Sequence, residues 1–223
     1  MTEQRPHLSI ERLLERSDID PKALHEHAAE LTRRRILLAA MKSFAAKGYQ
    51  ATTIREIAAA AGVTLGAVYH HFQGKKELLM SVNRLRQIRS WELLRDAVAN
   101  SEEFFEALKG ALREQFRFLA TDPVLRGVTR EYMGMALTDR EFNEMHNAHD
   151  VEFRDLVENE LKHRYPNLSE GKRERLVQIL FISLEGLFTS LVMESPMAAN
   201  PVGLLDALID FLQTTIEKWS ATL

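Results

Sequence analysis

Residues 32–80 constrain the fold more than any other part of the chain, because they read as three short helices joined by tight connections. Ile36, Ala40 and Phe44 recur every four residues and predict one apolar helix face. Gly48 should end this first helix, as a glycine just past a helix commonly does. Three small helices with a glycine in the middle turn match the helix-turn-helix plan.

The second and third helices each have a recognisable start. Thr53 and Glu56 form a capping-box pattern, in which each side chain bonds the other residue's backbone amide. This helix should stop at Gly62, and Thr64 should then cap a helix that reaches about Phe72. The connection between them is therefore only two or three residues long, as a helix-turn-helix requires.

The charges of the chain are divided unevenly. The formal net charge is −3, which by itself argues against a nucleic-acid-binding protein. Residues 32–76, however, contain eight Lys or Arg and one acidic residue, a net charge of +7 that leaves −10 for the rest. A basic segment in an acidic chain predicts that this segment meets nucleic acid.

The same segment resembles the DNA-binding domain of the TetR family of bacterial repressors. The resembling residues are Ile36, Leu37, Ala40, Phe44, Gly48, Tyr49, Thr52, Thr53, Ile57, Ala58, Ala61, Gly62, Val63, Thr64, Gly66, Tyr69, His71, Phe72 and Lys75. The family's C-terminal domain has little sequence signature, so nothing residue-specific follows there. The resemblance implies an all-α fold, with the helix-turn-helix domain joined to a helical bundle for ligand binding and dimerisation.

The third helix is short and carries few charges, which suits insertion into the major groove of duplex DNA. Gly66 lies in its first turn, where glycine costs about 1 kcal/mol against alanine. Close approach of the backbone to DNA is one compensation, and a packing contact is the alternative. The resemblance implies phosphate contacts for Tyr69, phosphate or base contacts for His70 and His71, and a base contact for Arg55, which could instead be a solvated side chain. The expected DNA contacts are Thr53, Arg55, Thr64, Leu65, Gly66, Ala67, Tyr69, His70, His71 and Lys75.

Lys75 opens a long helix, where a cation opposes the helix dipole. A phosphate beside that helix start would remove the penalty and accept hydrogen bonds from the backbone amides.

Five long or medium helices should follow, opened by Asn100, Asp122, Thr138, Ser169 and Asn200. We therefore expect a partly helical extension in residues 1–30, with Ser9 as a possible cap and a helix running on from about Pro21. The DNA-binding domain then spans residues 31–76 and the bundle residues 77–223.

The composition excludes several classes of protein. Cysteine is absent, so disulfides and thiolate chemistry are excluded. No window is read as long and apolar enough to span a bilayer, and no signal peptide is recognised, so we expect a cytoplasmic protein without membrane contact. No nucleophile motif, glycine-rich phosphate loop or catalytic carboxylate pair is found, so we expect neither enzymatic activity nor a cofactor.

The bundle should hold a small-molecule effector that is mostly apolar. The expected lining is Trp91, Phe118, Met133, Phe142, Met145 and Glu185, and methionines make such walls adaptable. Glu185 could be the counter-ion of a cationic effector, although an acid at this point also resembles one near the family's dimer seam. Arg117 or Arg130 could hold a carboxylate at the mouth of a cavity, which favours a neutral or anionic effector.

Glu144, His146, His149 and Asp150 lie close together on one helix. His146 has helical spacing to both His149 and Asp150, which would allow a shared metal ion. A solvated polar face is the more common meaning of such a pattern, so we expect no metal.

The last two long helices should pack against the same two helices of a second chain in a homodimer, as they do in family members. Their apolar faces contain Phe181, Leu184, Phe188, Leu208, Phe211 and Leu212. The function expected overall is a repressor that binds a palindromic operator as a dimer and is released by its effector. The alternative is a DNA-binding protein of the same fold that responds to no small molecule.

Overall fold

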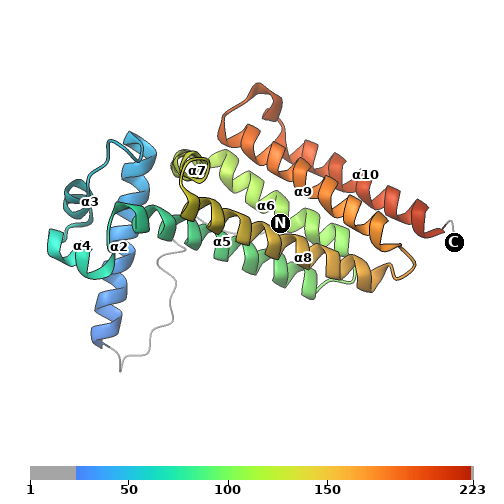
Figure 1. Ribbon diagram of the computed structural model, residues 1–223, viewed down its shortest axis with the longest axis horizontal. Coiled ribbons are helices and arrows are strands. Elements are labelled where there is room, and N and C mark those ends of the chain that lie inside the picture. The colour runs from blue at the N-terminus through green and yellow to red at the C-terminus, as the bar shows by residue number, and fades with distance from the viewer. Residues whose placement is uncertain (1–23, 222–223) are drawn as a thin grey trace, which may run out of the picture. The chain divides into compact units, whose positions relative to one another are not determined.

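The computed structural model describes residues 24–221, and every regular element in that range is a helix. The all-α fold class is therefore confirmed. The cap at Ser9 and the start near Pro21 lie outside the described residues. Tight internal packing divides the chain into two compact units, one up to Asn83 and one from Arg84 onward. Figure 1 shows the helices of each unit.

The first unit is built on α2 (Leu24–Lys47), α3 (Ile54–Ala61), α4 (Leu65–His71) and the start of α5 (Lys75–Ala99). Both α3 and α4 pack against α2. Ile36, Phe44 and Ile57 are fully buried at the centre of this unit, and Val68 of α4 joins them. The expected apolar faces thus form one core, and burying each large side chain contributes roughly 1.5–3 kcal/mol.

Local signals place the helix ends of this unit. Gly48 and Gly62 both have positive φ, 80° and 64°, the left-handed conformation that follows many helices. Thr53 and Glu56 form the complete capping box expected, and the Thr64 side chain accepts a hydrogen bond from the amide of Ala67. These starts and stops are confirmed because each depends only on residues within one turn.

Gly62→Ala is expected to lower the free energy of unfolding by about 1–2 kcal/mol, since only the left-handed backbone resists a side chain here. A Cβ at Gly62 meets no atom within 4 Å. Gly110→Ala is the control, because that position also has open space but lies inside an ordinary helix; it should raise stability by up to about 1 kcal/mol. Denaturant unfolding of both variants measures the difference, and equal signs would contradict the prediction.

The second unit contains the rest of α5 and five further α-helices. They are α6 (Phe104–Thr121), α7 (Pro123–Ala136), α8 (Arg140–Arg164), α9 (Glu170–Val192) and α10 (Pro201–Ala221), with a short 3-10 turn η2 (Pro196–Ala198) before α10. Helix α9 packs against α6, α7, α8 and α10, so it is the central helix of this bundle. The sequence pattern did not predict η2.

Two of the expected helix starts in this unit are wrong, that of α6 by three residues and that of α8 by one. Asn100 belongs to the end of α5, where its amide donates to the carbonyl of Asp96, and α6 begins after Glu103 without a side-chain cap. Asp139 caps α8, while the Thr138 hydroxyl donates back to the end of α7. In each stretch the first polar side chain bonds back to the preceding helix, so the next helix begins later.

The other three starts lie where the sequence indicates. Asp122 accepts from the amide of Leu125 at the start of α7, and Asn200 accepts from the amide of Gly203 at the start of α10. Ser169 precedes α9 but makes no capping hydrogen bond. Helix α9 ends at Val192, and Glu194 shortly after it has a left-handed φ of 55°.

Helix α9 also corrects the expectation about membrane-spanning windows. It is long and apolar enough to cross a bilayer by length and composition, with a mean hydropathy of 1.5 over 18 residues. Its position explains this composition, because one side supplies core residues such as Leu180 and Leu184 and the opposite side exposes Ile179 and Ile182. A central bundle helix with a second apolar face can be as long and as apolar as a membrane-spanning helix. The length and hydropathy of α9 are therefore weak evidence that it spans a membrane.

Candidate functional site

Helix α4 presents one face to solvent and anchors the other in the first unit. Val68 is fully buried and Phe72 is 2% exposed, so both hold the helix on α2 and α3. Leu65 and Tyr69 are 37% and 54% exposed, although both are large apolar or aromatic side chains. The exposed face also includes Gly66 and His70. An exposed apolar and aromatic helix face on a rigid support is suited to reading a partner surface.

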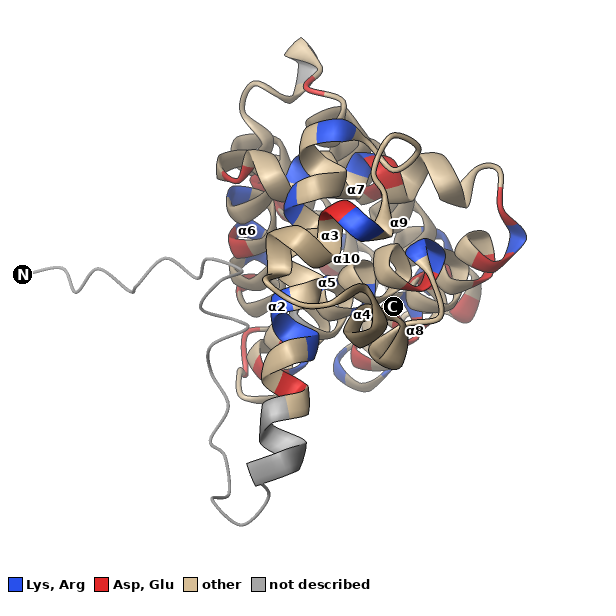
Figure 2. Cartoon of the chain, turned by 90° about the vertical axis from the view of Figure 1, so that its left-hand side faces the viewer, with Lys and Arg blue, Asp and Glu red and all other residues tan. Residues whose placement is uncertain are grey.

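Helix α4 contains no lysine, arginine, aspartate or glutamate. Figure 2 shows the helix without Lys, Arg, Asp or Glu, while basic residues lie on α2 and at the start of α3 and α5. Burial lowers the pKa of His71, with smaller contributions from His70 and Arg33, so this imidazole is neutral at neutral pH. Hydrogen bonds and apolar contacts, rather than ion pairs, are what α4 itself can offer to base edges.

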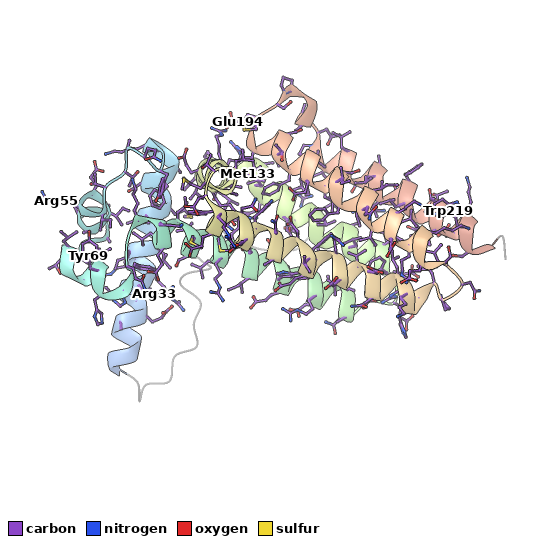
Figure 3. All side chains as sticks on the ribbon, in the orientation of Figure 1. Arg33, Arg55, Tyr69, Met133, Glu194 and Trp219 are labelled. Atoms are coloured by element: carbon purple, nitrogen blue, oxygen red, sulfur yellow. The ribbon has the colours of Figure 1, made fainter. Side chains whose placement is uncertain are left out.

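Arg55 is an exposed cation on α3, the helix that precedes α4 in the sequence. Its side chain lies in the first turn of α3 and makes no hydrogen bond or ion pair with residues 24–221. Figure 3 shows Arg55 on α3 and Tyr69 on α4. The neighbouring Thr53 is occupied by its capping box, because its hydroxyl both accepts from the amide of Glu56 and donates to the Glu56 carboxylate.

Glu56 also joins α3 to α2. Its carboxylate accepts a hydrogen bond of 2.7 Å from the Lys47 ammonium, and this bond and those from Thr53 lower the pKa of Glu56 to about 2. The single acid of the basic segment is therefore ionised and neutralised by Lys47. Arg33 is similarly engaged, with its guanidinium 5.1 Å from the centroid of the Phe72 ring.

Lys75 has a local role that the sequence did not reveal. Its ammonium donates a hydrogen bond of 3.1 Å to the carbonyl of Gln50 and lies 4.5 Å from the centroid of the Tyr49 ring. The start of α5 is thereby tied to the connection between α2 and α3. An ammonium has three donors, so a phosphate contact by Lys75 is compatible with this position and stays a prediction.

Comparison with known proteins identifies the segment that contains α3 and α4. Residues 36–82 match the model of the bacterial regulatory proteins of the tetR family. This segment is therefore of the TetR-family type. The HTH-type transcriptional regulator SrpR of Pseudomonas putida is 52% identical over 59 residues, which are 26% of this chain and 28% of SrpR. The similarity to SrpR thus spans less than a third of that relative's length.

Two longer matches extend beyond the DNA-binding domain. The HTH-type transcriptional repressor AcnR of Corynebacterium efficiens is 24% identical over 187 residues, covering 84% of this chain and 93% of AcnR. The solved SmeT–triclosan complex, a repressor structure from Stenotrophomonas maltophilia, has a TM-score of 0.68 and 24% identity, covering 82% of this chain and 90% of SmeT. At this identity, the structural match shows that the TetR fold extends through the second unit.

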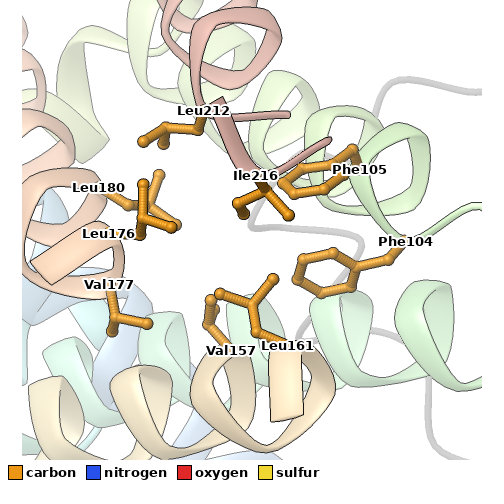
Figure 4. Close-up of a pocket in the computed structure, with 9 residues that line it drawn as sticks. All are labelled: Phe104, Phe105, Val157, Leu161, Leu176, Val177, Leu180, Leu212 and Ile216. Carbon is orange, nitrogen blue, oxygen red and sulfur yellow. The ribbon is translucent and has the colours of Figure 1, made fainter. Parts of the chain in front are cut away.

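The residues expected to line an effector cavity are dispersed in the second unit. Phe142 is fully buried beside Tyr132, whereas Trp91, Phe118, Met133 and Met145 are partly exposed. The apolar pocket in Figure 4 has a volume of only about 10 Å³ and contains none of the expected residues. Its lining is Phe104, Phe105, Val157, Leu161, Leu176, Val177, Leu180, Leu212 and Ile216. A space of this size is close to that of one water molecule, so this pocket is not an effector site.

The two arginines considered as anchors for a carboxylate are engaged near the surface. Arg117 is 55% exposed and pairs with Glu114 one turn away. Arg130 donates to the carbonyl of Val192 and pairs with Glu194 at 3.2 Å. The expectation of a neutral or anionic effector rested on these side chains, and their engagement removes that support.

A cluster of partly buried polar side chains surrounds Glu185 of α9. His146 Nε2 lies 3.9 Å from Glu185 Oε2 and 3.8 Å from Asp150 Oδ2. Burial, followed by the nearby Asp150 carboxylate, raises the pKa of Glu185, while His146, His149 and Arg86 oppose the rise. Glu144 was expected beside these residues of α8, but it pairs with Arg140 at 2.6 Å.

Trp91 of α5 borders this polar cluster. Its ring lies 6.0 Å from the His149 ring and 6.4 Å from the Phe153 ring, measured between centroids. The indole N–H is buried and has no hydrogen-bond partner in the described part of the chain. An unpaired buried donor costs about 1–3 kcal/mol, so a water or a ligand group that accepts from it would be stabilising.

The residues expected at the dimer interface divide between the core and the surface. Leu184 and Leu212 are 9% and 2% exposed and face the interior of the protomer. Phe181 stacks against Phe153, and Phe188 lies beneath the Arg86 guanidinium. Of the six, Phe211 is strongly exposed, at 63%, and Leu208 is partly exposed. The interface expectation is therefore corrected for Leu184 and Leu212, because the apolar faces predicted for α9 and α10 are largely those that build the bundle core.

Proposed function

We propose that this chain is a DNA-binding transcriptional repressor that recognises a near-palindromic operator as a homodimer. The observation that carries this proposal is the exposed face of α4, which includes Leu65, Gly66, Tyr69 and His70 on a helix capped by Thr64. An α-helix presented in this way fits the major groove, and a symmetric dimer reads two half-sites one helical turn or a multiple apart. The regulator and repressor names of SrpR and AcnR support it.

Two substitutions should separate base reading from phosphate binding. Arg55→Ala should narrow the affinity gap between operator and random DNA by about 1–3 kcal/mol if Arg55 contacts a base. Lys75→Gln keeps a donor for the Gln50 carbonyl but removes the charge, so it should weaken all DNA alike and flatten the salt slope by about one unit. Arg117→Ala, in the second unit, is the control and should change neither quantity.

Binding titrations at several salt concentrations, on a duplex selected from genomic DNA, measure these effects. Affinity for the operator should fall steeply with salt, because released counterions dominate the binding free energy. Salt-independent binding, or a changed sequence preference in Lys75→Gln with an unchanged slope, would contradict the assignment.

We also propose that a small molecule binds in the second unit and releases the operator. Trp91 supports this proposal, because its unpaired indole N–H lies on α5, the helix that begins at Lys75 in the first unit. The complex of SmeT with triclosan shows that a neighbour of the same fold takes an aromatic compound. A ligand that shifted α5 would alter the separation of the two recognition helices in a dimer.

The size of the pocket in Figure 4 favours a second candidate, a repressor that needs no organic effector. A thermal-shift screen with matched cationic, neutral and anionic aromatic compounds distinguishes the two. A true effector stabilises the protein by an amount set by its concentration and dissociation constant, and it should also release operator DNA. Stabilisation that is lost in Trp91→Phe places the ligand at the indole N–H, whereas no response to any compound favours the second candidate.

A homodimer is proposed through the outer faces of α9 and α10. Ile179 and Ile182 of α9 are 46% and 70% exposed, and Leu204 and Phe211 of α10 are 48% and 63% exposed. These residues lie at helical spacing on the sides of the two helices opposite to their core residues. Two adjacent helices with exposed apolar stripes form a surface that a second copy of the chain would cover.

A further inference from the structure

Three side chains of the second unit converge from two helices without bonding to one another. His146 and Asp150 lie one turn apart on α8, and Glu185 comes from α9, which packs against α8. His146 Nε2, one oxygen of Asp150 and one oxygen of Glu185 all lie within 4.8 Å of one another. The His146 separations of 3.8 Å and 3.9 Å are too long for hydrogen bonds.

The separations are close to those in a metal site. Metal–ligand bonds of about 2.0–2.2 Å in a tetrahedral site place neighbouring ligand atoms about 3.3–3.6 Å apart. The two separations from His146, 3.8 Å and 3.9 Å, are a few tenths of an ångström longer than this, and the two carboxylate oxygens lie within 4.8 Å of each other, so side-chain rotations would bring the three ligand atoms together around an ion. The side chains are 29%, 18% and 37% exposed for His146, Asp150 and Glu185, so an ion can enter from solvent yet remain partly shielded.

The charges around the cluster also indicate which ion fits. Asp150 and Glu185 bring two carboxylates together in a half-buried position, which is unfavourable without a cation. Arg86 supplies part of the compensation, because it interacts electrostatically with Glu185. The remaining negative charge is small for Mg²⁺ or Ca²⁺, which bind mainly through oxygen ligands. An imidazole nitrogen with two carboxylates suits a transition metal such as Zn²⁺.

We propose that His146, Asp150 and Glu185 bind one divalent transition metal ion of the zinc type. Three protein ligands leave a coordination position for water or a further ligand. His149 lies beside the site, with its Nδ1 3.8 Å from the other Asp150 oxygen, and can orient that carboxylate. The ion links α8 to α9 next to Trp91 and Arg86 of α5, and this proposal does not depend on DNA binding or on an organic effector.

Calorimetric titration of ZnCl₂ into the untagged full-length protein, stripped with a chelator and dialysed, tests the site directly. One ion should bind per chain. Glu185→Gln and His146→Gln should each weaken Zn²⁺ binding by at least about 100-fold. Loss of a group that only supports a metal ligand already weakens metal binding by up to about 100-fold, and these two residues are ligands themselves. Glu144→Gln is the matched control, because it removes an acid of the same helix that pairs with Arg140 instead.

Thermal unfolding with and without ZnCl₂ supplies a second readout. Zn²⁺ should raise the melting temperature of the unaltered protein and of Glu144→Gln, but not of Glu185→Gln or His146→Gln. Unfolding in chelator alone shows whether each variant folds, and Asp150→Asn replaces any variant that does not. The proposal is overturned if no saturable Zn²⁺ binding occurs, if the ligand variants bind as the unaltered protein does, or if Mg²⁺ binds more tightly than Zn²⁺.

Discussion

Ile182→Glu should convert the protein from a dimer to monomers and abolish operator binding. Ile182 is 70% exposed on the outer face of α9, and a glutamate there would lie unpaired inside the proposed interface. Desolvating an unpaired charge costs several kcal/mol, enough to shift a dimer equilibrium by several orders of magnitude. Because each chain holds one recognition helix, a monomer reads only one half-site and loses most of its affinity.

Light scattering after size exclusion measures the assembly, and gel shifts on the selected operator measure binding. Leu137→Glu is the matched control, because Leu137 is 87% exposed at the end of α7, away from α9 and α10 in the sequence, and should leave both properties intact. Phe211→Glu on α10 should repeat the effect of Ile182→Glu. A monomer at micromolar concentration in the unaltered protein, or a stable dimer of Ile182→Glu, would show that this surface is not the interface.

Gly66→Ala should make the protein slightly more stable while weakening operator binding by at least about tenfold, or 1.4 kcal/mol. A Cβ at Gly66 meets only the Thr64 hydroxyl at 3.9 Å, so the folded chain has room for it. Alanine is better than glycine inside a helix by about 1 kcal/mol. Packing within the protein therefore does not explain this glycine. Close approach of the α4 backbone to DNA would explain it, because a side chain at this position would keep the two apart.

The two effects of Gly66→Ala are measured independently, by denaturant unfolding and by operator titration. Gly110→Ala is again the comparison, since it gains the same helix propensity in α6 and should bind DNA normally. If Gly66→Ala bound the operator as tightly as the unaltered chain, the backbone of α4 would not approach DNA closely, and the glycine would need another explanation.

The first unit was predictable because its signals are local. A capping box such as Thr53 with Glu56 and a left-handed stop such as Gly62 involve residues a few positions apart, so the chain specifies them before any tertiary packing. Val68 and Phe72 then form the buried face of α4. The contacts of Lys75 with Gln50 and Tyr49 were not predicted, because they depend on how the first unit folds.

The second unit shows what the sequence alone leaves open. Helices α9 and α10 are apolar on more than one side, so periodicity could not say that Leu184 and Leu212 face the core while Ile182 and Phe211 face solvent. Only the packing of neighbouring helices selects the inner face. Glu185 likewise meets His146 through the contact of α9 with α8. The sequence by itself determined an all-helical chain with a helix-turn-helix segment. The tertiary structure decided which faces are inner and which distant polar side chains meet, because those depend on contacts between helices far apart in the chain.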